Sequence, residues 1–125
     1  MALPDHSVQP ETLLIVDDNA AVRSALQAYM TRVAGWQVVL TAGDAGRGLL
    51  LAAEQAPTAI VLDNRMPGGD GLDILSDLRR ACPDARIVMH TSEDTIDLRQ
   101  EAVRRGADAI VSKGRPLSEL AALIR

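Results

Sequence analysis

Short runs of apolar residues recur along this chain, and longer segments that mix polar and apolar residues separate them. A continuous apolar run bounded by polar residues is typical of a parallel strand that is buried on both faces. The runs predict strands at about 12–17, 37–41, 59–62, 86–90 and 109–112.

The separating segments are predicted to be helices, because their apolar residues recur at a helical spacing. They span about 20–33, 44–55, 70–81, 94–105 and 116–125. Asp18 or Asn19 is expected to cap the first helix, and Ser92 the fourth. The strict alternation predicts an α/β fold, a (βα)5 chain with helices on both faces of a five-stranded parallel sheet. Such chains are typically doubly wound, with the strand order 2-1-3-4-5 of flavodoxin-like folds.

Composition and charge narrow the class of protein. A chain of 125 residues with 47% hydrophobic and 24% charged residues fits one soluble domain, here 12–125, after a flexible leader, 1–11. A net charge of −4 argues against binding of nucleic acid or an anionic membrane by this segment. Cys82 is the single cysteine, and neither a signal peptide nor a membrane-spanning run is apparent. We therefore expect a cytoplasmic protein.

Polar side chains of complementary chemistry follow the predicted strands. Two acids, Asp17 and Asp18, follow the first strand and Asp63 follows the third, while Thr91 and Lys113 follow the fourth and fifth. Because ligands of an open parallel sheet bind beyond the carboxyl ends of its strands, these groups are expected to converge. Clustered carboxylates repel one another, and a hard divalent cation such as Mg²⁺ relieves that repulsion.

Each of these residues also has an ordinary structural interpretation. Asp, Ser and Thr are common helix caps, and a lysine is usually solvated. Adjacent acids after one strand and a further acid after another nevertheless favour a functional site, and Lys113 is the only lysine in a chain that otherwise uses arginine. His90 is interpreted as a satisfied core side chain, and the pairs Arg79-Arg80 and Arg104-Arg105 as solvated helix ends.

Short motifs stand in a fixed order near the ends of the predicted strands. They are Val16-Asp17-Asp18-Asn19, Leu62-Asp63, Met66-Pro67, Asp70-Gly71, His90-Thr91-Ser92, Gly106-Ala107 and Lys113. Each motif alone is a weak signal, but the ordered set resembles the receiver domain of two-component response regulators over about residues 12–125. The resemblance implies a phosphorylation switch rather than a metabolic enzyme, in which the domain catalyses its own phosphoryl transfer and dephosphorylation.

The resemblance also implies a role for each member of the acid cluster. Asp63 would accept the phosphoryl group from a sensor histidine kinase or a phosphotransfer protein. Asp18 would bind Mg²⁺ directly and Asp17 partly through water. Asp63 and the backbone carbonyl of Arg65 would complete the metal site. Phosphoryl transfer needs mainly in-line positioning and neutralisation of charge, which such a site supplies.

Thr91 and Lys113 would contact the transferred group. The Thr91 hydroxyl would donate to the phosphoryl group, and Lys113 would pair with one of its oxygens. Movement of Thr91 would then shift the surface around the fourth helix and the fifth strand. Receivers usually carry an aromatic switch residue three positions before the lysine, where this chain has Ile110, which can pack in the same cavity but offers no ring to a partner.

Arg65 and Glu93 stand two positions after Asp63 and Thr91 respectively, and they carry opposite charges. We expect them to form a salt bridge over the phosphoryl group that slows attack by water. The alternative is two independently solvated side chains.

The output is open to more than one interpretation. The segment 113–120 resembles receivers that precede a LuxR-type DNA-binding domain, which implies regulation of transcription through a domain not present in this chain, together with a phosphorylation-dependent homodimer. A stand-alone receiver acting by protein–protein contact is the alternative. An aspartyl-phosphate phosphatase is disfavoured because no second acid stands two positions after Asp17 or Asp63. A flavin-binding electron carrier is disfavoured because aromatic residues make up only 2% of the chain.

Overall fold

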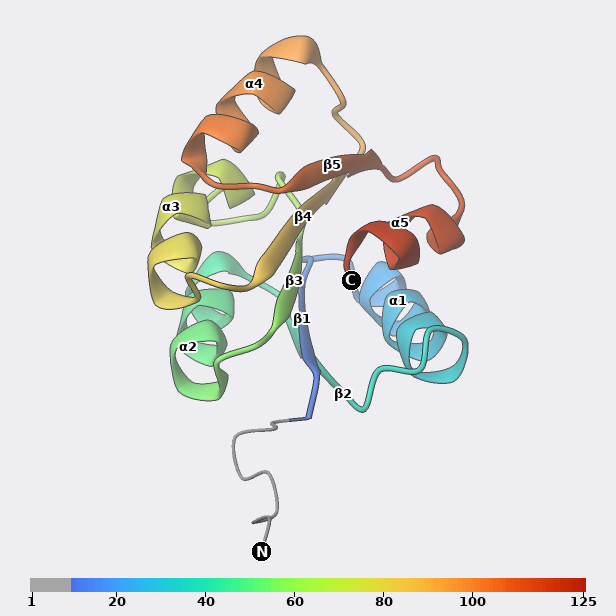
Figure 1. Ribbon diagram of the computed structural model, residues 1–125. Coiled ribbons are helices and arrows are strands. Elements are labelled where there is room, and N and C mark those ends of the chain that lie inside the picture. The colour runs from blue at the N-terminus through green and yellow to red at the C-terminus, as the bar shows by residue number, and fades with distance from the viewer. Residues whose placement is uncertain (1–9) are drawn as a thin grey trace, which may run out of the picture.

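The computed structural model describes residues 10–125, and a parallel sheet of five strands forms its centre (Figure 1). The strands lie side by side in the order β2-β1-β3-β4-β5, which confirms the predicted topology. Their bounds are β1 Thr12–Val16, β2 Val38–Ala42, β3 Ala59–Leu62, β4 Arg86–Thr91 and β5 Ala109–Ser112. Residues 1–9 of the predicted leader lie outside the described residues, so the division into leader and domain stays a prediction.

Helices cover both faces of the sheet, as the alternation predicts (Figure 1). Two of them, α1 Ala20–Arg32 and α5 Leu117–Leu123, lie on one face. The other face is covered by α2 Ala45–Gln55, α3 Gly71–Ala81 and α4 Ile96–Arg105. None of the helices within residues 10–125 has the length and apolar character that crossing a membrane requires.

The apolar runs are continuous because the strands are buried on both sides. In β1, Leu13 and Ile15 belong to the core cluster under α1 and α5, whereas Leu14 and Val16 belong to the cluster under α2 and α3. All four side chains are 0% exposed. Alternate residues thus enter opposite cores, which is what a doubly covered parallel sheet requires.

The predicted cap of the fourth helix is wrong. Thr95 caps α4, because its hydroxyl accepts a hydrogen bond from the Leu98 amide at 3.1 Å. Ser92 is exposed in the preceding loop. That loop is longer than expected, since the backbone turns at Thr91 before the helix begins and the Thr91 hydroxyl accepts from the Glu93 amide. The first helix is capped by Asn19, one of the two residues expected.

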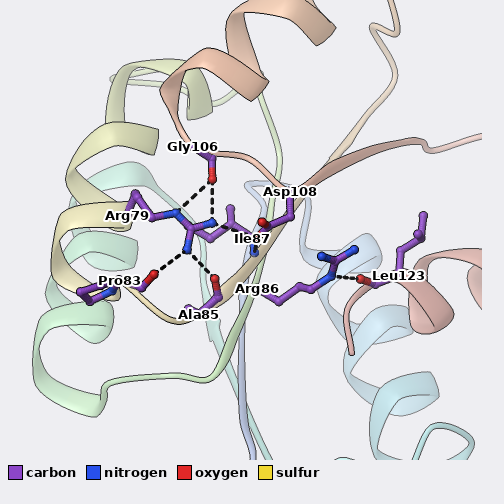
Figure 2. A network of polar contacts seen from close by, with 8 residues as sticks. All are labelled: Arg79, Pro83, Ala85, Arg86, Ile87, Gly106, Asp108 and Leu123. Atoms are coloured by element: carbon purple, nitrogen blue, oxygen red, sulfur yellow. Dashed lines mark hydrogen bonds and ion pairs between the residues drawn. The ribbon is translucent and has the colours of Figure 1, made fainter.

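Arg79 is also not the solvated helix end that its position suggests. Figure 2 shows its guanidinium reaching from α3 to the start of β4 and to the turn between α4 and β5. It donates to the carbonyl of Gly106 at 2.7 and 3.1 Å, to those of Pro83 and Ala85 at 3.2 and 2.5 Å, and to the Asp108 carboxylate at 2.8 Å. These acceptors come from a turn and from loops at this edge of the sheet, and the sequence around Arg79 does not indicate them.

The other three arginines of these pairs divide in the same way. Arg80 is a surface residue, and Arg104, which pairs with Glu101, is exposed as well. Arg105 instead donates to the carbonyl of Leu72 in α3 at 2.8 Å and to Glu101 at 2.6 Å. The prediction of a solvated end therefore holds for one arginine of each pair.

Candidate functional site

The predicted site residues come together at one edge of the sheet. Asp17, Asp63 and Lys113 each directly follow a strand, namely β1, β3 and β5, and Thr91 is the last residue of β4. Because the strands are parallel, all of these positions lie at the carboxyl edge. The convergence that the sequence predicts is present in the structure.

Three carboxylates form a tight cluster at this edge. One oxygen each from Asp17, Asp18 and Asp63 lies within 4.8 Å of the others. Asp17 and Asp63 are buried, whereas Asp18 is exposed. Burial and the charge of Asp17 raise the pKa of Asp63 above its ordinary value, although Lys113 opposes the shift. An all-oxygen set with one solvent-facing member fits a hard divalent cation.

Lys113 lies between the two buried acids. Its ammonium nitrogen is 2.9 Å from Oδ2 of Asp17 and 3.2 Å from Oδ2 of Asp63. Burial by itself lowers the pKa of the lysine, but the hydrogen bonds and the negative charges of both aspartates outweigh it and raise the pKa. The ammonium is therefore a fixed positive charge beside both carboxylates.

The loop after Asp63 is held in place by two residues outside the predicted site, Asn64 and Gly71. The Asn64 side chain accepts a hydrogen bond from the Leu72 amide at 3.2 Å, and its carbonyl accepts from the Gly71 amide at 2.6 Å. A Cβ at Gly71 would lie 2.2 Å from the Asp63 carbonyl oxygen, so only glycine fits there. The Asp70-Gly71 pair was visible in the sequence, but the reason for its glycine was not.

Thr91 lies at the same carboxyl edge as the acid cluster, and Ile110 packs in the core beneath α4. Thr91 is fully buried, its hydroxyl accepts from the Glu93 amide at 3.1 Å, and its carbonyl accepts from the Lys113 amide at 2.9 Å. The ends of β4 and β5 are thereby joined. Ile110 is buried in the core cluster that includes Ala102 of α4. Its role as a switch stays a prediction.

Arg65 and Glu93 form the ion pair that the sequence predicts. Their charged atoms are 2.6 Å apart, and the pair joins the loop after β3 to the loop after β4. The side chains are 69% and 38% exposed, so the pair contributes little to stability. The effect of the pair on the lifetime of the phosphorylated form stays a prediction, as does the Arg65 carbonyl as a metal ligand.

His90 is buried as expected but is not satisfied. Within residues 10–125, neither ring nitrogen has a hydrogen-bond partner. Burial and the charge of Lys113 lower the pKa of His90 to about 4, so the imidazole is neutral near pH 7. The ring lies in the core next to the charged edge, and none of the residues that the structure describes offers it a hydrogen-bond partner. The prediction of a satisfied side chain is wrong.

Comparison with known proteins identifies the family. A model of the response regulator receiver domain matches residues 13–125. The chain belongs to this family. Receiver domains of two-component systems interact with histidine kinases or phosphotransfer partners, and they are generally not metabolic enzymes.

Named relatives and solved structures agree with the family. TcrX of Mycobacterium tuberculosis, a probable transcriptional regulatory protein, is 32% identical over 117 residues, which are 94% of this chain and 49% of that protein. The response regulator MprA of Mycobacterium leprae is 37% identical over 113 residues, 90% of this chain and 49% of that protein. The chain thus spans about half the length of these relatives.

Two solved structures of response regulators are similar to this chain. A response regulator from Burkholderia pseudomallei, solved with a phosphorylated aspartic acid, a calcium ion and citrate, has a TM-score of 0.85 and 27% identity, over 92% of this chain and 66% of that one. A LuxR-family response regulator from Aurantimonas has a TM-score of 0.83 and 29% identity, over 91% of this chain and 81% of that one.

Proposed function

We propose that Asp63 accepts a phosphoryl group from the phosphohistidine of a sensor kinase or phosphotransfer protein in the cytoplasm, in a reaction that depends on Mg²⁺. The observation that carries the proposal is the carboxylate cluster itself, in which three acids lie within 4.8 Å of one another and a single ammonium, that of Lys113, neutralises them only in part. Clustered charge of this kind is costly in a purely structural role and useful for binding a cation and a phosphoryl group.

The chain's own residues divide the work. A carboxylate oxygen of Asp63 attacks phosphorus, the bond between phosphorus and the donor nitrogen breaks, and an acyl phosphate forms. Asp18, Asp63 and the Arg65 carbonyl would hold the cation, and Asp17 would contribute partly through water. Bound Mg²⁺ supplies neutralising charge for the phosphoryl oxygens. Lys113, already poised next to Asp63, pairs with one of these oxygens.

Phosphorylation then changes the surface around α4 and β5. The Thr91 oxygen accepts a hydrogen bond from Glu93, which leaves its O–H free to donate to a phosphoryl oxygen. Turning of Thr91 moves the loop before α4, and Ile110 repacks beneath that helix. The added group carries close to two negative charges, enough to bias a two-state surface.

The output is regulation of transcription. Support comes from relatives about twice as long that are named as transcriptional regulators and from a neighbour of the LuxR family. In this proposal the phosphorylated form dimerises and drives a DNA-binding domain outside this chain. A stand-alone receiver that contacts a partner protein is the alternative, and the gene sequence after Arg125 decides between them.

A small-molecule phosphodonor with Mg²⁺, followed by mass measurement of the intact protein, tests the phosphorylation step. The wild-type protein should gain the mass of one phosphoryl group and lose that ability when EDTA is present. Asp63→Asn should gain none, whereas Asp44→Asn, which alters a carboxylate that caps α2, should behave as the wild type. A gain of mass by Asp63→Asn would show that another residue is the acceptor.

A further inference from the structure

Every polar atom of Asp17 has a partner in the protein. Its amide donates to the Ala42 carbonyl at 3.0 Å, one carboxylate oxygen accepts from the Asn19 amide at 2.9 Å, and the other faces Lys113 at 2.9 Å. The remaining atom, the backbone carbonyl, accepts a hydrogen bond of 2.7 Å from Nη1 of Arg23. The last of these contacts has no role in the function proposed above.

Arg23 joins three segments at the carboxyl edge. It projects from α1, it holds the carbonyl just after β1, and its guanidinium lies against Gly43, which follows β2. A Cβ at Gly43 would be 3.0 Å from Nη1 of Arg23 and 3.4 Å from its Cζ. Gly43 is not among the residues with positive φ. Its lack of a side chain therefore serves the close approach of Arg23 rather than the backbone conformation.

The bond from Arg23 controls the orientation of a peptide unit. The Asp17 carbonyl and the Asp18 amide belong to one planar peptide group, so fixing the carbonyl fixes the direction in which the chain leaves β1. Within residues 10–125, the Asp18 carboxylate has no hydrogen bond or ion pair of its own, although its oxygen lies in the acid cluster. The backbone before it is what places Asp18.

We propose that Arg23 is a positioning residue that orients the Asp17–Asp18 peptide, so that the exposed Asp18 carboxylate is presented to a divalent cation. The proposal rests on the proposed function, because it assumes that the acid cluster binds Mg²⁺. Charge-assisted bonds to backbone carbonyls are strong and directional, and a guanidinium can donate from one nitrogen while it packs against a glycine. Loss of a partner that orients a metal ligand typically weakens metal binding by about 10- to 100-fold.

Calorimetric titration of the protein with Mg²⁺ alone measures this effect. Arg23→Gln should raise the Mg²⁺ dissociation constant by about tenfold or more. The matched control is Arg47→Gln, which removes the same charge from an exposed position in α2, after the same strand as Gly43. Because exposed charges are screened, the control should change the constant by less than about twofold.

Gly43→Ala tests the geometry without changing any charge. The new methyl group displaces the guanidinium from Gly43, and the dissociation constant should rise by about threefold or more. Combined with Arg23→Gln, it should have no further effect, because the side chain that it displaces is then absent. Urea unfolding of each variant shows whether the fold persists, and Gly43→Ala keeps the test decisive if Arg23→Gln does not fold.

The outcomes separate this proposal from the proposed function. Wild-type protein that binds no Mg²⁺ would overturn both. Wild-type binding with an unchanged constant in Arg23→Gln and Gly43→Ala would overturn the positioning role alone. Equal weakening in Arg23→Gln and Arg47→Gln would show that charge, not orientation, is what Arg23 contributes.

Discussion

At the carboxyl edge of the sheet, three clustered carboxylates face the ammonium of Lys113, whereas at the opposite edge the guanidinium of Arg79 is surrounded by acceptors. At the carboxyl edge, burial and the charge of Asp17 raise the pKa of Asp63, so its ionised form is disfavoured in the folded protein. At the opposite edge, the guanidinium of Arg79 already donates its hydrogen bonds to acceptors in the protein (Figure 2). One edge is left electrically unbalanced for a ligand, and the other is completed by the chain itself.

The largest change in the free energy of unfolding is expected from a substitution of Arg79. Arg79→Met leaves the carbonyls of Gly106 and Ala85 without their donor and removes the charged partner of Asp108, whose carboxylate keeps its hydrogen bond from the Ile87 amide. We expect the free energy of unfolding to fall by about 3 kcal/mol or more, because several partly buried acceptors lose a charged donor and each costs about 1 to 3 kcal/mol when left unpaired. Urea denaturation measures it.

The neighbouring arginine supplies the control for that experiment. Arg80 is 79% exposed at its side chain and pairs with Asp77 at 3.4 Å. Arg80→Met should change the free energy of unfolding by less than about 0.5 kcal/mol. Equal losses in the two variants would contradict the view that the Arg79 edge is a stabilising network.

The second effect concerns His90 and is seen as a pH dependence. Its pKa is lowered from the ordinary value of 6.5 to about 4 in the folded protein, so the unfolded chain takes up the proton first as the pH falls. Stability is therefore lost as the pH falls from about 6.5 to about 4. We expect a loss of about 2 to 3 kcal/mol.

His90→Met isolates this contribution because methionine fills a similar volume and does not titrate. The difference in unfolding free energy between wild type and variant should change across that pH window and be flat above it. A constant difference from pH 7 to pH 4 would show that His90 is not buried as a neutral ring.

The third effect is a stabilisation at the site. Because the pKa of Asp63 is raised, protonation of Asp63 stabilises the folded state at low pH, and that contribution is lost as the pH rises through its folded-state pKa. At neutral pH without Mg²⁺, Asp63→Asn should therefore raise the free energy of unfolding, by roughly 1 kcal/mol. Asp44→Asn, which exchanges two equally good caps, should leave it unchanged. A destabilised Asp63→Asn would mean that Lys113 already balances the cluster.

The smallest effect on stability is expected at the exposed ion pair. Arg65→Ala should change the free energy of unfolding by less than about 0.5 kcal/mol. The same variant should shorten the lifetime of the phosphorylated form a few-fold, because water then reaches the phosphoryl group more easily. Glu93→Ala should match it. If both lifetimes equal that of the wild type, the pair is not a lid.

The strands, the helices and the acids and lysine that meet at the carboxyl edge could be predicted from the sequence. Burial on both faces makes a strand apolar throughout, so runs such as 13–16 mark the strands directly. Parallel strands then bring their following residues to one edge, which is why Asp17, Asp63 and Lys113 could be grouped without coordinates. These inferences depend on repeating patterns along the chain, which one sequence contains in full.

The partner of each polar group, by contrast, depends on how the chain folds in three dimensions. Arg79 and Gly106 are 27 positions apart, and the Thr95 cap depends on where the loop after β4 ends. His90 looks like any residue of a buried strand until the acceptors around it are known to be absent within residues 10–125. Hydrogen bonds are short and directional, so they depend on how separate segments pack against one another, and no periodicity along the chain records that packing.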